Sequence, residues 1–148
     1  MTTTMAVTTT QLYQVFIRAT PEAIWDAITK PEFTTQYFHG AHIELRDGRR
    51  WSKLDDGRAW DEPILEEDPP RRLVHQWSSG YNPEMAAEEP SRVTWEIEPR
   101  DDGTCLLTVV HDRLEGAPLT AAGVSGEGWT YVLSNLKTFL ETGRPFDD

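Results

Sequence analysis

The chain has 148 residues and a formal net charge of −11 at pH 7, and 38% of its residues are hydrophobic. This length suffices for one domain with a hydrophobic core and is too short for two ordinary domains. The acidic balance argues against nucleic acid and anionic membranes as partners, because both attract clusters of Lys and Arg. We expect the two basic pairs, Arg49-Arg50 and Arg71-Arg72, to lie on a solvated surface.

Simple patterns predict the location of the protein and the limits of its domain. The single cysteine, Cys105, cannot form an internal disulfide, and no apolar run approaches the ~20 residues of a membrane-spanning helix. The first residues, MTTTMAVTTTQ, lack the basic region and apolar core of a signal peptide. We therefore expect a cytoplasmic protein without membrane contact, with a flexible N-terminal tail at 1–11 and a single domain at 12–148.

The first predicted elements are a strand and two short helices. Apolar and polar side chains alternate over residues 12–19, which predicts the strand. Thr20 and Pro21 predict that a helix follows, because a Thr hydroxyl can cap the first turn and Pro fits within it. That helix must stop before Pro31, where a second short helix begins that ends near Gly40.

About six strands are predicted after the two helices, joined mostly by tight turns. Asp47-Gly48, Asp56-Gly57 and Asp102-Gly103 are typical of turns between antiparallel strands. Pro63 places the run 58–67 at a sheet edge or at a β-bulge, because proline cannot donate a ladder hydrogen bond. The economical interpretation is a meander of antiparallel hairpins.

The last three predicted strands, at 72–79, 91–99 and 105–112, carry large side chains on their inner faces. Alternation assigns to these faces Leu73, His75, Trp77, Val93, Trp95, Ile97, Leu107, Val109 and His111. Both faces of the strand at 105–112 are apolar, and we favour the one that ends in His111.

The last predicted element is a long amphipathic helix from about Glu127 to Thr142, which would span roughly 24 Å. Spacings of three and four gather one apolar stripe of Trp129, Val132, Leu133, Leu136, Phe139 and Leu140. Gly143 and Pro145 predict where the helix ends. The glycine-rich segment 113–128 is expected to be a loop leading into it. This element order is α+β, and the sheet must curl around the helix to cover its stripe.

Four segments resemble the AHSA1-like (activator of Hsp90 ATPase homologue) family of the START-like (SRPBCC) superfamily. They are TPEAIWDAITKPEFTTQYF, DPPRRLVHQW, DDGTCLLTVVHD and, most specifically, GWTYVLSNLKTFLETG. The resemblance covers nearly the whole chain, from about Tyr13 to Pro145. It implies a helix-grip fold, in which a curved antiparallel sheet wraps the C-terminal helix and leaves a cavity between them. It also implies an apolar small-molecule ligand, and some relatives in the superfamily are cyclases or hydrolases.

The candidate ligand-binding residues are aromatic, imidazole and aliphatic side chains that would face this cavity. They are Tyr37, Phe38, His75, Trp77, Trp95, His111, Trp129 and Leu133. We expect them to enclose a small apolar ligand, aromatic or lipid-like, with Tyr37, His75 or His111 fixing its orientation by hydrogen bonding. The segments 31–39 and 80–90 could form a lid. Large aromatics also fill cores, so a solidly packed interior is the alternative.

Two chemical alternatives remain open. His111 with its neighbour Asp112 could act as an acid or base in a cyclase or hydrolase, although adjacent strand residues point to opposite faces. His39, His42 and Glu44 have the side chains of a metal site, but their spacing favours surface histidines, and we expect neither a metal nor a cofactor.

An interaction role is the other alternative. A co-chaperone or partner-binding module would act through an exposed apolar patch, with the cavity absent or reduced. Edge strands and exposed aromatics also leave a homodimer open.

Overall fold

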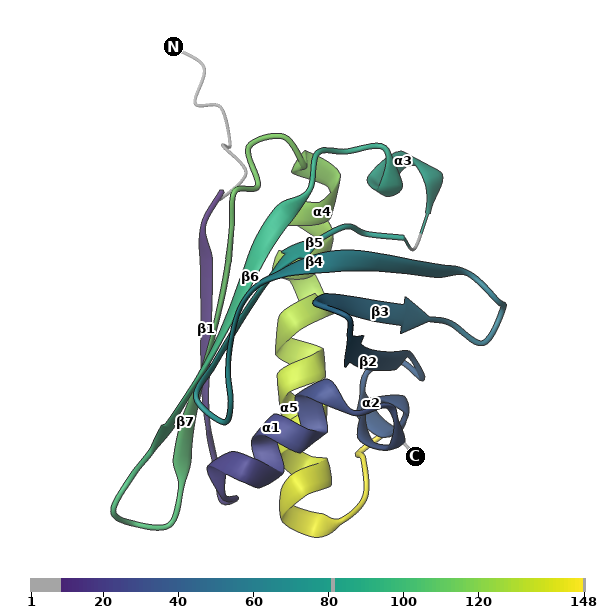
Figure 1. Ribbon diagram of the computed structural model, residues 1–148. Coiled ribbons are helices and arrows are strands. Elements are labelled where there is room, and N and C mark those ends of the chain that lie inside the picture. The colour runs from purple at the N-terminus through teal and green to yellow at the C-terminus, as the bar shows by residue number, and fades with distance from the viewer. Residues whose placement is uncertain (1–8, 81, 148) are drawn as a thin grey trace.

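The computed structural model describes residues 9–80 and 82–147 as a curved sheet that wraps a long C-terminal helix (Figure 1). The strands are β1 (Gln11–Ile17), β2 (His42–Arg46), β3 (Arg49–Lys53), β4 (Ala59–Asp68), β5 (Arg72–Trp77), β6 (Ser91–Pro99) and β7 (Cys105–Asp112). The helices are α1 (Pro21–Thr29), α2 (Pro31–Tyr37), α3 (Pro83–Ala86), α4 (Pro118–Gly123), the π-helical turn η1 (Val124–Gly128) and α5 (Trp129–Thr142).

Two of the sequence-based expectations fall partly on residues that are not described. Residues 1–8 of the predicted tail lie outside the described residues, whereas Gln11 already belongs to β1. Tyr81, within the predicted lid segment, also lies outside them.

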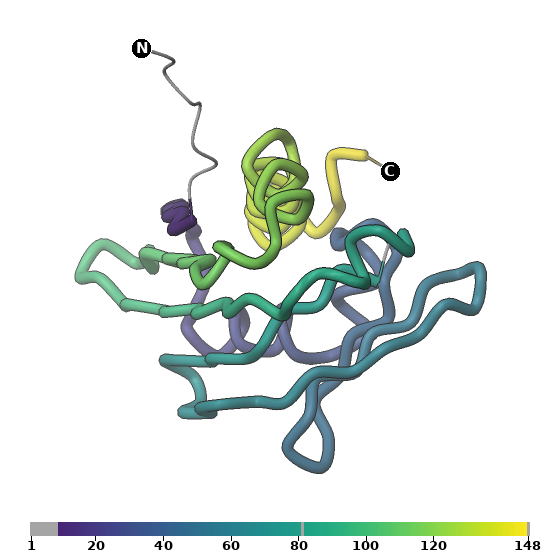
Figure 2. The backbone as a smooth tube through the Cα atoms, turned by 90° about the horizontal axis from the view of Figure 1, so that it is seen from above, coloured from purple at the N-terminus to yellow at the C-terminus, as the bar shows by residue number. Residues whose placement is uncertain are grey.

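The seven strands formed by the described residues make one antiparallel sheet in the order β1-β7-β6-β5-β4-β3-β2. The first and last strands are neighbours, with Gln11 opposite His111 and Ile17 opposite Cys105. The view along the helix shows the strands curving around one side of α5 (Figure 2). This arrangement is the α+β helix-grip fold that the sequence predicted.

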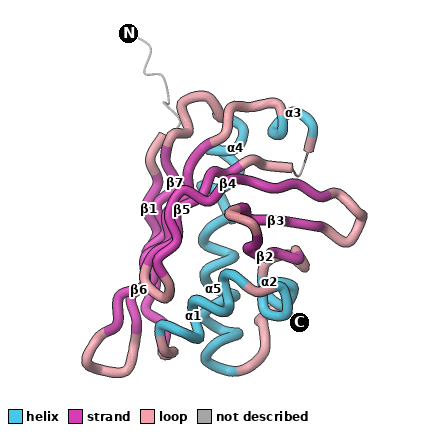
Figure 3. The backbone as a smooth tube through the Cα atoms, in the orientation of Figure 1, coloured by secondary structure: helices cyan, strands magenta, loops and turns pink. Residues whose placement is uncertain are grey.

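The helices divide between the two ends of α5. Helices α1 and α2 lie near its C-terminal end, and α3 and α4 lie at the opposite end (Figure 3). In the part of the chain that the structure describes, no helix is both long and apolar enough to cross a membrane.

Local stereochemistry confirms the predicted start of α1 and the predicted end of α5. Thr20 Oγ1 accepts a hydrogen bond from the backbone N–H of Ala23 at 3.1 Å, which caps α1. Gly143 ends α5 in the left-handed conformation (φ 85°), and its N–H donates to the carbonyl oxygen of Phe139 at 2.8 Å. The irregularity predicted at Pro63 is a bulge, because β4 pairs on both sides and its register with β5 shifts between Ile64 and Glu66.

The loop predicted at 113–128 is wrong for most of its length, because α4 and η1 continue directly into α5. A π-helical turn is wider than an α-helical one and accommodates one extra residue. A Cβ atom at Gly128 would lie only 3.0 Å from the carbonyl oxygen of Gly123. Gly128, one of the glycines that suggested a loop, is therefore a residue that permits this turn. Helix α3, in the segment expected to be a loop, was also not predicted.

The predicted apolar stripe of α5 forms the centre of the core. Trp129, Val132, Leu133 and Leu136 are buried, whereas Phe139 and Leu140 are partly buried beside the same cluster. The inner-face residues of β5, β6 and β7 join the cluster, which confirms the choice of the face that ends in His111. The helix is held by burial of its stripe against the concave side of the sheet.

Leu136→Ala tests this account, because Leu136 is 0% exposed at the middle of the stripe. Removing the side chain should lower the free energy of unfolding by about 2–5 kcal/mol, measured by urea denaturation. Leu119→Ala removes the same atoms from a side chain that is 51% exposed, and it should change stability by no more than about 0.5 kcal/mol. Equal unfolding midpoints for the two variants would contradict a core centred on α5.

Candidate functional site

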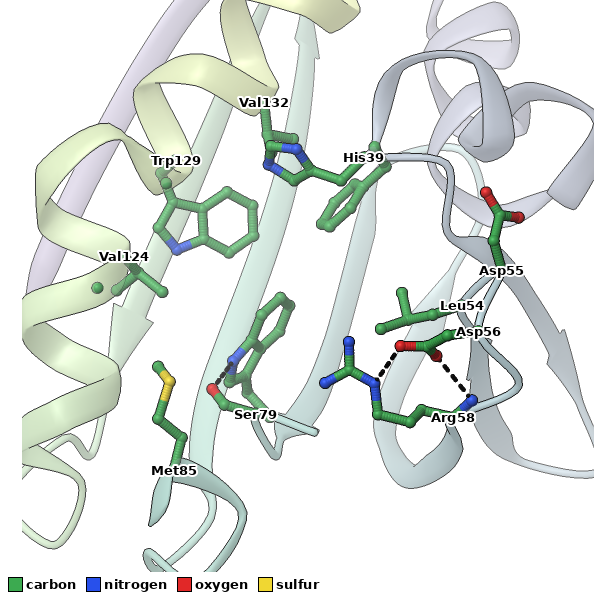
Figure 4. A pocket seen from close by; sticks show the side chains of 14 residues that line it. His39, Leu54, Asp55, Asp56, Arg58, Ser79, Met85, Val124, Trp129 and Val132 are labelled. Carbon is green, nitrogen blue, oxygen red and sulfur yellow. Dashed lines mark hydrogen bonds and ion pairs between the residues drawn. The ribbon is translucent and has the colours of Figure 1, made fainter. Parts of the chain in front are cut away.

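A pocket of about 510 Å³ lies between the helical segment 123–132 and the sheet (Figure 4). Its helical side consists of Gly123, Val124, Gly128, Trp129 and Val132. Its other sides consist of Phe38, His39, Leu54, Asp55, Asp56, Arg58, Trp77, Ser79 and Met85. The volume falls within the range of small-molecule sites.

Three aromatic rings form the inner wall of the pocket. The ring centres of Trp77 and Trp129 are 5.5 Å apart, and Phe38 meets Trp129 edge to face at 6.4 Å. All three side chains are at most 6% exposed. They are held in place by their neighbours and offer a rigid apolar surface to whatever enters.

The rim is polar and carries charge. Arg58 donates from its backbone N–H to Asp56 Oδ1 at 3.0 Å and from Nε to Asp56 Oδ2 at 2.8 Å. These hydrogen bonds lower the pKa of the Asp56 carboxyl, and the one from the backbone N–H has the largest effect. Asp55 adds a second carboxylate, and the His39 ring stacks on Tyr131 with centres 5.3 Å apart. The apolar interior of the pocket therefore opens to solvent, and its rim carries more acidic than basic side chains.

His111 lies behind the aromatic wall, fully buried, with both ring nitrogens engaged. Trp129 Nε1 donates to His111 Nδ1 at 3.0 Å, so in the neutral ring the proton is on Nε2, which lies 2.7 Å from Ser91 Oγ. Burial lowers the pKa of His111 to about 4, against the opposing effect of Asp112. The ring is neutral at pH 7 and donates to Ser91, which is the opposite of a base that activates a serine.

His75 and Tyr37 are likewise satisfied inside the protein. Trp95 Nε1 donates to His75 Nε2 at 3.0 Å, and His75 Nδ1 lies 2.8 Å from the carbonyl oxygen of Gln76. Burial holds the pKa of His75 well below its usual value. The Tyr37 hydroxyl donates to the carbonyl oxygen of Ala27 at 2.8 Å, and burial raises its pKa. All three predicted orienting groups have partners within the fold.

The structure brings three of the eight predicted ligand-binding residues to the pocket, namely Phe38, Trp77 and Trp129. The other five are buried in the protein and are not part of its lining: Tyr37, His75, Trp95, His111 and Leu133. Strand alternation indicates which face a side chain occupies, but not whether another side chain stands in front of it.

The remaining lining residues were not predicted as site residues. Asp55, Asp56 and Arg58 belong to a turn that the Asp-Gly signal identified as exposed, and nothing in that signal places the turn beside a pocket. Val124 was assigned to a loop. Both predicted lid segments contribute to the lining, through Phe38 and His39 in the first and Met85 in the second.

Arg50 corrects the expectation that both basic pairs are solvated, because it is only 2% exposed. Its Nη1 lies 3.3 Å from Glu62 Oε1, and the second oxygen of Glu62 accepts from the backbone N–H of Ser78 at 2.8 Å. Burial raises the pKa of Glu62 to about 7, with Arg50 opposing that rise. Alternation along β3 explains why the two arginines differ in exposure. Arg49 points outward to Asp61, whereas Arg50 points inward.

The histidines considered as metal ligands do not converge. His39 stacks on Tyr131, whereas His42 Nε2 lies 3.7 Å from Glu44 Oε1. Within residues 9–80 and 82–147, no group of three or more His, Cys, Asp or Glu side chains could hold a metal ion.

Comparison with solved structures shows the same fold in several proteins. MLL2253 from Mesorhizobium loti has a TM-score of 0.72 and 23% identity over 89% of this chain and 96% of its own. DynU16, from the dynemicin biosynthetic locus, has a TM-score of 0.73 and 24% identity over 93% of this chain and 49% of its own. The Aha1 dimer from Colwellia psychrerythraea has a TM-score of 0.68 and 19% identity over 90% of this chain and 97% of its own.

No curated protein matches the chain significantly. The sequence model of the family described as "Activator of Hsp90 ATPase homolog 1-like protein" matches residues 18–141, which is most of the chain. The helix-grip architecture agrees with that match. The chain therefore belongs to the family of Activator of Hsp90 ATPase homolog 1-like proteins.

Proposed function

We propose that the protein binds a small apolar molecule, aromatic or lipid-like, in the pocket beside α5. The observation that carries this proposal is the inner wall of Phe38, Trp77 and Trp129, which faces a space of about 510 Å³. Each 100 Å² of apolar ligand surface removed from water there would contribute roughly 2.5 kcal/mol. Rigid rings add to this by lowering the entropy cost of binding.

Two further points support a small-molecule role. DynU16 has the same fold and is described as a protein in the dynemicin biosynthetic locus. The charged rim and the apolar interior are also the arrangement that lets an apolar ligand enter from water and then lose its hydration. A cytoplasmic location is part of the proposal.

Binding is favoured over catalysis because of how the histidines are used. His111 was the candidate acid or base, yet it does not line the pocket and its Nε2 proton is directed at Ser91. A cyclase or hydrolase mechanism that uses His111 needs this ring in contact with the substrate. The co-chaperone alternative needs an apolar surface patch, and the exposed large apolar side chains include Leu12 and Phe16 on β1.

The Colwellia relative is described as a dimer, and we extend that state to this chain as part of the proposal. Strand β1 is an edge of the sheet, and its outer face carries Leu12 and Phe16, 59% and 51% exposed. Such an edge offers apolar side chains to a second copy.

The pocket is tested by Val124→Trp, which places an indole in the space that the ligand would fill. N-phenyl-1-naphthylamine, a neutral probe that fluoresces in apolar surroundings, should bind the wild-type protein and lose at least about tenfold in affinity in the variant. Leu119→Trp adds the same side chain at an exposed position and should bind the probe as the wild type does. If all three proteins bind the probe equally, the pocket is not the site.

The dimer is tested by Phe16→Lys, which places a charge on the exposed face of β1. Sedimentation analysis should show a dimer for the wild-type protein and a monomer for the variant, because a lysine in an apolar contact must be desolvated. Leu65→Lys, on a side chain that is 48% exposed in β4, should leave the dimer intact. A wild-type protein that sediments as a monomer would refute the dimer.

A further inference from the structure

The guanidinium of Arg50 has more hydrogen-bond donors than partners. It carries five N–H groups, and within the described residues it donates only from Nη1 to Glu62 Oε1, at 3.3 Å. Among the described residues, Arg50 Nε is the one buried side-chain nitrogen or oxygen without a partner. Buried donors are almost always paired, so this one requires an acceptor that the chain itself does not supply.

The Arg50 guanidinium lies behind the inner wall of the pocket. Its central carbon is 5.3 Å from the ring centre of Trp77 and 5.9 Å from that of Phe38, and both rings line the pocket. Leu54, which follows Arg50 by four residues in the chain, also lines the pocket. Arg50 itself does not line the pocket, so a ligand atom would have to pass between the two rings to reach its donors.

The surroundings hold Arg50 in place and leave part of its hydrogen-bonding capacity unused. Glu62 is fixed from the other side by the backbone N–H of Ser78. Burial raises the pKa of Glu62, and the Arg50 guanidinium opposes that rise. His75, the neighbouring imidazole, is kept neutral by its burial and by Arg50 itself. An anionic oxygen would accept charge-assisted hydrogen bonds from the donors that remain.

The rim has the opposite charge. Asp55 and Asp56 lie at the entrance, and Arg58 pairs with Asp56, so the rim retains negative charge. An amphiphilic anion would be repelled at the rim and attracted at the inner end. The field of the pocket therefore favours one orientation, with the anionic group inward.

We propose that Arg50 anchors the anionic head group of the ligand, so that the pocket accepts an aromatic or lipid-like acid in preference to a neutral molecule of the same shape. This inference rests on the proposed function and specifies its ligand class. The apolar body of the acid packs on Phe38, Trp77 and Trp129, and its carboxylate or equivalent oxygen accepts hydrogen bonds from the guanidinium.

Two fluorescent probes that differ by one acidic group provide the test. 1-Anilinonaphthalene-8-sulfonate carries a sulfonate, whereas N-phenyl-1-naphthylamine is the same skeleton without it. The wild-type protein should bind the sulfonate at least about tenfold more tightly, despite the net charge of −11. Arg50→Met should remove that preference and leave the affinity for the neutral probe unchanged.

Two further variants keep the test decisive if Arg50→Met alone is unstable. The double variant Arg50→Met with Glu62→Gln removes both charges, so no unpaired carboxylate is left buried. It should fold, as judged by its thermal unfolding, and bind the two probes equally. Glu62→Gln alone keeps the guanidinium and should keep the preference for the sulfonate.

The outcomes separate this inference from the function on which it rests. If the wild-type protein binds both probes equally and Val124→Trp blocks both, the pocket is the site but Arg50 is no anchor. If Arg50→Met weakens both probes by the same factor, Arg50 only supports the wall, and the inference is wrong. If neither probe binds the wild-type protein, both the inference and the proposed function fail.

Discussion

The structure depends on the burial of one face of α5 against a sheet long enough to curve around it. Leu136 is inaccessible to solvent at the middle of that face, and the inner side chains of β5, β6 and β7 join it in one cluster. The pairing of β1 with β7 brings the beginning of the chain beside its last strand. The sheet and the helix therefore stabilise each other, and neither would bury enough apolar surface alone.

The pocket lies where the helix changes its geometry. The wide turn η1 and the glycines at 123 and 128 give that part of the helical segment little side-chain volume. Met85 approaches this surface so closely that a Cβ atom at Gly123 would lie 3.2 Å from its Cε. After the turn, the large side chain of Trp129 forms part of the pocket wall. The hydrogen bond from its Nε1 to His111 keeps the indole in one position. Space and rigidity thus occur side by side, as ligand recognition requires.

Polar groups in the core have two different roles. His75 and His111 accept hydrogen bonds from Trp95 and Trp129, so each indole N–H has a partner and the rings can be packed without an unsatisfied donor. Arg50 differs because its donors outnumber the acceptors around it. The hydrogen bonds between the histidines and the tryptophans explain how the aromatic wall is held in place. The unfilled donors of Arg50 indicate where the pocket would prefer an anionic group.

The sequence alone determined the order of the strands and of α1, α2 and α5, the inner faces of β5, β6 and β7, the start of α1, the end of α5 and the apolar stripe of α5. These features follow from the periods of 2 and 3.6 residues and from the local stereochemistry of Thr20, Pro21 and Gly143. The tertiary structure decided that Trp77 and Trp129 face open space while His75 and His111 do not, that Arg50 is buried, and that Asp55 and Asp56 border the pocket. Those outcomes depend on the separation and register of segments far apart in the chain, which no local pattern encodes.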